Sequence, residues 1–213
     1  MKDCGRGSLL ASKVPVVTYL LILANVVIFF YMMELPGTVY ADFIYRYGLV
    51  PASIMQGEQL PTLITSMFLH GSILHLALNM LFLLVSGGEC ERAMGNSKFL
   101  AFYLISGVGS GLFHTYMNST SPIPAIGASG AIFGVLAAFA ILFPFRMVIS
   151  LVGFIPIPLP AIVFVLLSVW LETVYVFTGD NPHIAHTAHI GGFLAGFFLT
   201  LLFGPSKQEA EDT

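Results

Sequence analysis

The chain has 213 residues, of which 57% are hydrophobic and only 9% are charged, and its formal net charge is −3. Soluble domains usually carry about 25% charged residues, so this composition excludes an ordinary soluble domain. It leaves a chain whose surface mostly faces lipid.

Apolar runs that suit a bilayer crossing of about 20 residues recur along the chain. In order, they cover residues 14–33, 73–87, 99–117, 125–145, 159–177 and 185–203. The second run is short, which suggests a helix partly shielded by protein. The first is too long for a removable signal peptide and lacks a small-residue cleavage site. We therefore expect an all-α, polytopic membrane protein with a six-helix domain at 14–203 and polar tails at 1–13 and 204–213.

The distribution of Lys and Arg orients these six helices. If the N-terminus is cytoplasmic, seven basic residues lie on the cytoplasmic side and Arg46 alone lies outside. The positive-inside rule favours this topology, which also returns the C-terminus to the cytoplasm. Cys4 and Cys90 then lie on the reducing side, and we expect no disulfide between them. The seven residues are Lys2, Arg6, Lys13, Arg92, Lys98, Arg146 and Lys207.

Three connections carry further structural signals. Residues 34–72 form a long, aromatic-rich outer loop broken by prolines and Gly57, which indicates an interfacial structure on the outer leaflet. The "IPIPLP" stretch at 155–160 predicts an inner loop, because proline disrupts a helix interior. Before the sixth helix, Asp180 or Asn181 is an N-cap candidate, with Pro182 at the first helical position.

The stretch "GASGAIFG" places Ser129 between small residues near the start of the fourth helix, about one turn inside it. Backbone N–H groups at a helix start lack acceptors and favour an oxyanion. Gly127 and Gly130 leave room for a substrate to approach. A purely structural interpretation is also open, because Gly130 and Gly134 have the spacing that lets membrane helices pack closely.

A second cluster, "TAHIGGFLAGF", opens the sixth helix and places His189 at a depth similar to Ser129. Ionisable groups within membrane segments are rare and mark functional interiors. Gly192 and Gly196 repeat the small-residue spacing, so the fourth and sixth helices could pack face to face. A histidine base beside a hydroxyl is the minimum needed for an activated serine nucleophile.

A third element lies in the second helix, where His75 and Asn79 are four residues apart and share one face. Together with the Ser129 N–H, these side chains could stabilise a developing oxyanion. Hydrogen bonding between helices, with no role in chemistry, is an equally open interpretation of this pair.

These three motifs, taken in their order along the chain (second, fourth and sixth helix), resemble the signatures of rhomboid intramembrane serine proteases of the bacterial six-helix type. The resemblance covers nearly the whole membrane region. It implies that Ser129 is the nucleophile and His189 the general base of a dyad, with His75, Asn79 and Ser129 stabilising the oxyanion. It implies substrates that are transmembrane segments of other membrane proteins. We expect no cofactor, no metal and no nucleic-acid partner, and an inner-membrane location with the site opening outward.

Two positions depart from the family pattern. The first outer loop reads "GEQLPTL" where many members carry a Trp-Arg pair. Phe133 stands four residues after the serine, where a tyrosine is common, so ring stacking on His189 is kept without the hydroxyl. Neither change removes a proposed catalytic group.

Other residues leave alternatives open. Glu172 lies well inside the fifth helix and is a minor candidate for orienting His189. His183, His186 and His189 are spaced by three, but on a regular helix they would not converge on one ion. His70 and His114 are better explained as interface or core residues. Two other function classes remain: a catalytically silent relative that binds transmembrane clients, and a small transporter or channel. The oligomeric state is not predicted.

Overall fold

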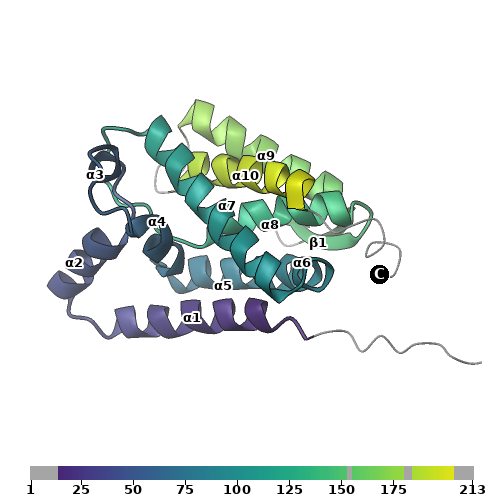
Figure 1. The fold of residues 1–213 in the computed structure, drawn as a ribbon, viewed down its shortest axis with the longest axis horizontal. Coiled ribbons are helices and arrows are strands. Elements are labelled where there is room, and N and C mark those ends of the chain that lie inside the picture. The colour runs from purple at the N-terminus through teal and green to yellow at the C-terminus, as the bar shows by residue number, and fades with distance from the viewer. Residues whose placement is uncertain (1–13, 153–154, 180–183, 204–213) are drawn as a thin grey trace, which may run out of the picture.

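The computed structural model describes residues 14–152, 155–179 and 184–203, and these residues are mostly helical (Figure 1). The elements in chain order are α1 (Val16–Met33), α2 (Gly37–Tyr47), α3 (Pro51–Met55), α4 (Thr62–Thr65), the 3₁₀ turn η1 (Ser66–Phe68), α5 (Ile73–Phe82), the π-helical turn η2 (Leu83–Gly87), α6 (Gly88–Met94), α7 (Asn96–Met117), α8 (Ser129–Leu142), β1 (Met147–Val152), β2 (Ile155–Pro160), α9 (Ala161–Thr178) and α10 (His186–Phe203).

Three helices among the described residues are long and apolar enough to cross a membrane. They are α1, the continuous helix Ile73–Met94 and α9. The apolar helices α8 and α10 are shorter. Helix α7 has 22 residues, but its serine, glycine and histidine residues make it less apolar. Each of the six predicted runs therefore contains one helix, although they differ in length and hydropathy.

The second apolar run is longer than the sequence predicted. Instead of ending near residue 87, the helix continues through η2 and α6 to Met94, a span of 22 residues. The prediction stopped where charged residues begin. One of these, Glu91, is only 1% exposed. Its charge is satisfied inside the protein, so it does not end the helix.

Glu91 caps the N-terminus of α1. Its Oε1 accepts a hydrogen bond from the Val17 N–H at 2.8 Å, and its Oε2 accepts from the Thr18 N–H and hydroxyl, both at 2.7 Å. The first N–H groups of a helix lack intrahelical partners and carry partial positive charge, so a carboxylate satisfies them well. This contact fastens α1 to α6, 73 residues away in the chain.

Helix α8 occupies the centre of the fold, and most of its residues are buried. At 14 residues it is about 21 Å long, less than the roughly 30 Å of a hydrocarbon core. The predicted run began at residue 125, but the helix begins at Ser129. The preceding residues are not helical: Ala125 exchanges two backbone hydrogen bonds with Leu49, and the Gly127 N–H donates to the Ser66 carbonyl. Ser129 is therefore the first helical residue, not one turn inside.

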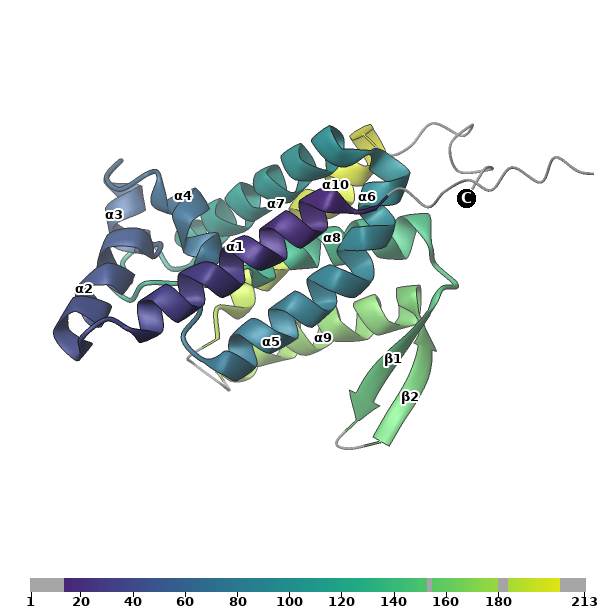
Figure 2. The same ribbon diagram turned by 90° about the horizontal axis from the view of Figure 1, so that it is seen from below.

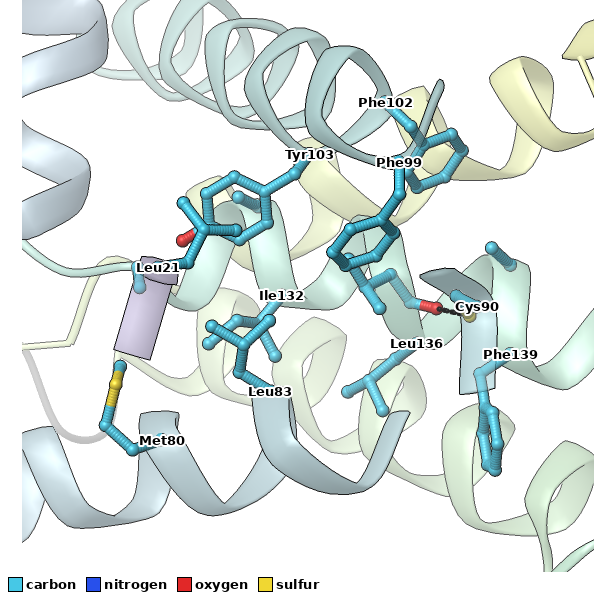
Figure 3. Close-up of a cluster of buried hydrophobic side chains, with 14 of the residues drawn as sticks. Leu21, Met80, Leu83, Cys90, Phe99, Phe102, Tyr103, Ile132, Leu136 and Phe139 are labelled. Atoms are coloured by element: carbon cyan, nitrogen blue, oxygen red, sulfur yellow. Dashed lines mark hydrogen bonds between the residues drawn. The ribbon is translucent and has the colours of Figure 1, made fainter. Parts of the chain in front are cut away.

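The hydrophobic core forms between α8 and the helices around it, as Figure 3 shows. Ile132, Leu136 and Phe139 of α8 point into this cluster. Cys90 lies there as a free, fully buried thiol, with its Sγ 3.7 Å from the Val135 carbonyl oxygen. Cys4 lies outside the described residues. Other members of the cluster are Leu21, Met80, Leu83, Phe99, Phe102 and Tyr103.

Residues predicted as an inner loop form an antiparallel hairpin, β1–β2, that projects from the helical body (Figure 2). The expectation of a purely helical chain was wrong at this point. Met147 pairs with Pro160, and the register continues to Val152 opposite Ile155. The three prolines of β2 are spaced by two, so their missing N–H groups all lie on one edge. The intervening residues remain available to pair with β1.

The long connection between α1 and α5 contains α2, α3, α4 and η1. Its predicted breaks coincide with element boundaries: Pro51 is the first residue of α3, Gly57 has φ +77°, and Pro61 immediately precedes α4. The N-cap candidates before the sixth helix, Asp180 and Asn181 with Pro182, lie outside the described residues. Helix α10 begins at His186.

Candidate active site

Ser129 and His189 meet where α8 and α10 begin. The Ser129 Oγ lies 2.7 Å from the His189 Nε2, within hydrogen-bond distance, although the two residues are 60 positions apart. His189 is 8% exposed, and Ser129 is half-buried. The arrangement places a hydroxyl in direct contact with an imidazole nitrogen, in a site partly shielded from solvent.

Glycines allow the two helices to approach this closely. A Cβ built on Gly192 would overlap the carbonyl oxygen of Gly130, and one on Gly196 would overlap the backbone of Gly134. The glycines of α8 (Gly130 and Gly134) therefore pack directly on those of α10 (Gly192 and Gly196). Gly134 also faces α7, because its Cβ would lie 2.5 Å from the Ser106 Cβ. Helix α8 is thus held closely between two helices.

The backbone before Ser129 requires a glycine. Gly127 has φ +128°, a conformation that L side chains rarely adopt, and a Cβ there would lie 2.9 Å from the His75 ring. The same point is 3.7 Å from the Ser129 Oγ. Gly127 therefore provides both the turn into α8 and open space between His75 and the serine. The Ser129 N–H belongs to the first helical turn, where backbone donors lack intrahelical acceptors.

His75 and Asn79 both lie on α5, but their environments differ. Ser72 caps α5 by accepting a hydrogen bond from the His75 N–H at 3.2 Å, and the half-buried His75 ring faces Gly127. Asn79 is 6% exposed, and its Nδ2 donates to the His75 carbonyl at 2.8 Å. The structure thus brings His75 to the serine. The amide of Asn79 has one hydrogen engaged within its own helix.

Phe133 stacks on His189. The ring centroids are 4.5 Å apart and the planes differ by only 5°. Phe133 lies one turn after Ser129 on α8, so a single helix carries both the hydroxyl and the ring that fixes the imidazole plane. The hydroxyl of a tyrosine is not needed for this contact.

Glu172 of α9 approaches the far side of His189. Its Oε2 lies 3.0 Å from the His189 Nδ1 and 2.6 Å from the His186 Nδ1. The second contact has good hydrogen-bond geometry, whereas the direction of the first falls outside the usual criteria. From the sequence, Glu172 is only a minor candidate for orienting His189, and His186 has no assigned role. Two features of the sequence could have identified these residues: Glu172 is an acid within a membrane helix, and His186 is a histidine three residues before His189.

The same three residues offer one ligand atom each, all within 4.8 Å of one another. Of the all-histidine series considered from the sequence, His186 and His189 belong to this set, and His183 lies outside the described residues.

Two other histidines lie near the site without contacting the serine in any described interaction. His114 places its Nδ1 2.6 Å from the Thr187 Oγ1, which ties α7 to the start of α10. The Ser110 hydroxyl adds to this connection by donating to the Ala188 carbonyl at 2.6 Å. His70 is fully buried beside His75, with ring centroids 4.9 Å apart. Both agree with the interface or core positions predicted for them.

A small cavity of about 40 Å³ lies beside Ser129, lined mainly by α7, the start of α8 and the residues just before α8. Its volume is enough for a water molecule, and several of its walls can hydrogen-bond. The polar residues of its lining are Ser66, Ser110, His114 and Ser129.

Comparison with known proteins gives consistent matches. A family model described as "Rhomboid domain" matches residues 57–206. The chain is 31% identical to Rhomboid protease GluP of Bacillus subtilis (strain 168), over 92% of this chain and 36% of GluP. It is 35% identical to Rhomboid protease AarA of Providencia stuartii, over 65% of this chain and 54% of AarA. It is 28% identical to Putative rhomboid protease YdcA of Bacillus subtilis (strain 168), over 91% of both chains. The chain thus spans about a third of GluP, half of AarA and nearly all of YdcA.

Proposed function

Because this chain belongs to the rhomboid family, we propose that it is an intramembrane serine endopeptidase that cleaves transmembrane segments of other membrane proteins. The observation that carries the proposal is the 2.7 Å contact between the Ser129 Oγ and the His189 Nε2. A silent relative or a transporter would have no need of a hydroxyl aligned on an imidazole acceptor.

In the proposed reaction, the Ser129 Oγ attacks the scissile carbonyl while the His189 Nε2 takes the hydroxyl proton. The same nitrogen then gives that proton to the leaving amine as the C–N bond breaks. Water hydrolyses the acyl-enzyme in a second half-reaction with His189 again as base. The parallel stack of Phe133 on His189 supports this role, because it fixes the imidazole plane through both transfers.

The oxyanion would form near the start of α8. The Ser129 N–H and the His75 ring, which faces Gly127, are its proposed donors. Asn79 would contribute the second hydrogen of its amide, since the first donates to the His75 carbonyl. Each donor is preorganised by the helix that carries it.

Hydrolysis within a membrane needs water at the active site, and the fold is consistent with a site where this water is shielded from lipid. Helix α8 is shorter than the hydrocarbon core, so its first residue, Ser129, would lie below the membrane surface. Neighbouring helices cover the non-helical backbone before it, the condition under which such backbone is tolerated at this depth. The cavity beside Ser129 offers room for water.

We also propose the six-crossing topology with both termini cytoplasmic, in a bacterial inner membrane, with the site opening to the outer side. Glu89 lies 3.1 Å from Arg92 and 3.4 Å from Arg146, so these two arginines share one end of the molecule. The positive-inside rule places that end in the cytoplasm. Helices α5 and α8 begin at the opposite end, near Ser129.

The test uses purified protein in detergent and in liposomes, with a fluorophosphonate probe and a panel of single-span membrane proteins. Wild-type protein should be labelled and should cleave at least one panel member, whereas Ser129→Ala should do neither. The variant should keep its helical content, because the hydroxyl is used for chemistry and not for packing. Cleavage by Ser129→Ala near the wild-type rate would contradict the proposal.

A further inference from the structure

The proton on His189 needs a partner that a two-residue mechanism does not supply. For the Ser129 hydroxyl to donate to Nε2, that nitrogen must be unprotonated, so a neutral imidazole carries its proton on Nδ1. The Nδ1 atom is buried. A buried N–H without an acceptor costs about 1–3 kcal/mol, and an imidazolium formed during catalysis would cost more. An acceptor beside Nδ1 is therefore expected on physical grounds.

Glu172 occupies that place. Its Oε2 is 3.0 Å from the His189 Nδ1, and its side chain is 15% exposed. In a setting this dry, a carboxylate interacts far more strongly with a developing positive charge than it would in water. Glu172 comes from α9, so the carboxylate links a third helix to the pair formed by α8 and α10.

His186 holds the carboxylate in position. Its Nδ1 lies 2.6 Å from the same Oε2, a short hydrogen-bond contact. The His186 ring is itself packed against Tyr175 of α9, with centroids 5.1 Å apart. The imidazole rings of His186 and His189 thus both contact the Oε2 of Glu172, and the His186 contact restricts where that oxygen can lie.

We propose that Glu172 is a positioning residue for the reaction, holding the Nδ1 proton of His189 and stabilising the imidazolium, with His186 fixing the carboxylate. The proposal rests on the proposed protease function and deepens it. When the Ser129 Oγ forms its bond to the carbonyl carbon, the hydroxyl proton moves to Nε2, and the Glu172 carboxylate, 3.0 Å from Nδ1, stabilises the positive charge of the imidazolium. As the C–N bond breaks, the Nε2 proton moves to the amine nitrogen, and the imidazole returns to its starting tautomer.

A metal site is the competing interpretation of the same three atoms, because two histidines and a carboxylate are common zinc ligands. In a tetrahedral site, Zn–N and Zn–O bonds of about 2.0–2.2 Å separate ligand atoms by roughly 3.3–3.5 Å. The 2.6 Å between the His186 Nδ1 and the Glu172 Oε2 is well below that separation and fits a direct hydrogen bond between the two side chains. The geometry therefore favours proton holding over metal binding.

The experiment compares wild type with Glu172→Gln, Glu172→Asp and the neighbouring control Thr173→Val, whose hydroxyl donates within α9. A serine protease that loses the acid behind its histidine falls by about 10⁴ in kcat, because the wrong tautomer forms. We expect Glu172→Gln to lower kcat on the order of 10² to 10⁴ with KM changed by less than about twofold. Glu172→Asp should restore part of the rate, and Thr173→Val should match wild type.

Several outcomes separate the possible failures. Wild-type kcat in Glu172→Gln, with Ser129→Ala inactive, would overturn the positioning role and leave the protease function standing. Cleavage by Ser129→Ala would instead remove the protease function. Stoichiometric zinc in purified wild type that Glu172→Gln releases would replace proton holding with a metal site.

A direct measurement on wild type keeps the proposal testable if Glu172→Gln does not fold. The ¹⁵N chemical shifts of the His189 ring report which nitrogen carries the proton. A proton on Nδ1 is the expected result, and a proton on Nε2 in the neutral ring would overturn the assignment.

Discussion

Gly192 of α10 lies directly against the carbonyl of Gly130 of α8, so closely that no Cβ could be added to Gly192 without displacing one of the helices. This contact, repeated one turn further on by Gly196 against Gly134, determines how far apart the helices that carry His189 and Ser129 can be. Glycine costs about 1 kcal/mol per helical position relative to alanine in water, which indicates that close packing is the reason for its use here.

Gly196→Leu should slow both cleavage and fluorophosphonate labelling. The substitution lies seven residues from His189, about 10 Å along α10, so it touches no catalytic group. A displacement of about 1 Å at a catalytic pair can cost on the order of 10² in rate. The matched control is Phe198→Leu on the same helix, because Phe198 is 60% exposed. Equal labelling rates for Gly196→Leu and wild type, with helical content confirmed, would show that these glycines do not set the Ser129–His189 distance.

His75→Ala and Asn79→Ala should lower turnover more than substrate binding. Removing one oxyanion donor typically costs on the order of 10² to 10³ in kcat. Steady-state kinetics on one cleaved substrate separates kcat from KM for each variant. Leu78→Ala, at an exposed position of α5, serves as the control. A normal kcat with a raised KM in either variant would assign that residue to substrate binding.

Glu91→Gln should destabilise the protein without altering the chemistry. The substitution removes a charge that receives three hydrogen bonds at the start of α1. Hydrogen bonds to charged groups contribute about 1.5–3 kcal/mol each, and each kcal/mol shifts Tm by roughly 2–4 °C in a chain of this size. Thermal unfolding in detergent measures the loss. Glu89→Gln, which breaks only partly exposed ion pairs, should change Tm much less.

The free energy of unfolding should decrease as the pH falls below about 6.5, with His70 contributing to the decrease. Burial, reinforced by the neighbouring His75, lowers the pKa of His70 to about 3. Between about pH 6.5 and pH 3 the unfolded chain binds a proton at this position and the folded chain does not. Lowering the pH through this range therefore lowers the free energy of unfolding. Unfolding temperatures at about pH 7.5 and pH 4.5 measure the change. His70→Asn, which cannot titrate, should show a smaller decrease, and an unchanged decrease would exclude His70 as a source.

Local patterns in the sequence were sufficient to locate the helices and the residues that meet at the site. Apolar runs report burial or lipid contact, so all six predicted runs contain a helix. The glycine-flanked Ser129, the ionisable His189 and His75 with its partner Asn79 stand out within such apolar runs, and the structure brings the Ser129, His75 and His189 side chains together around Gly127 and the start of α8. Small residues at fixed spacing identified the packing faces of α8 and α10.

Tertiary structure decided the features that depend on contacts between distant segments. The sequence could not show that Glu91 is buried against the start of α1, so the second helix was predicted to end too early. Nor could it show that Ala125 pairs with Leu49, which delays the start of α8 to Ser129. The approach of Glu172 to His189 depends on how α9 packs beside α10. Interhelical distance and rotation set such contacts, and the periodicity of a single helix carries no information about either.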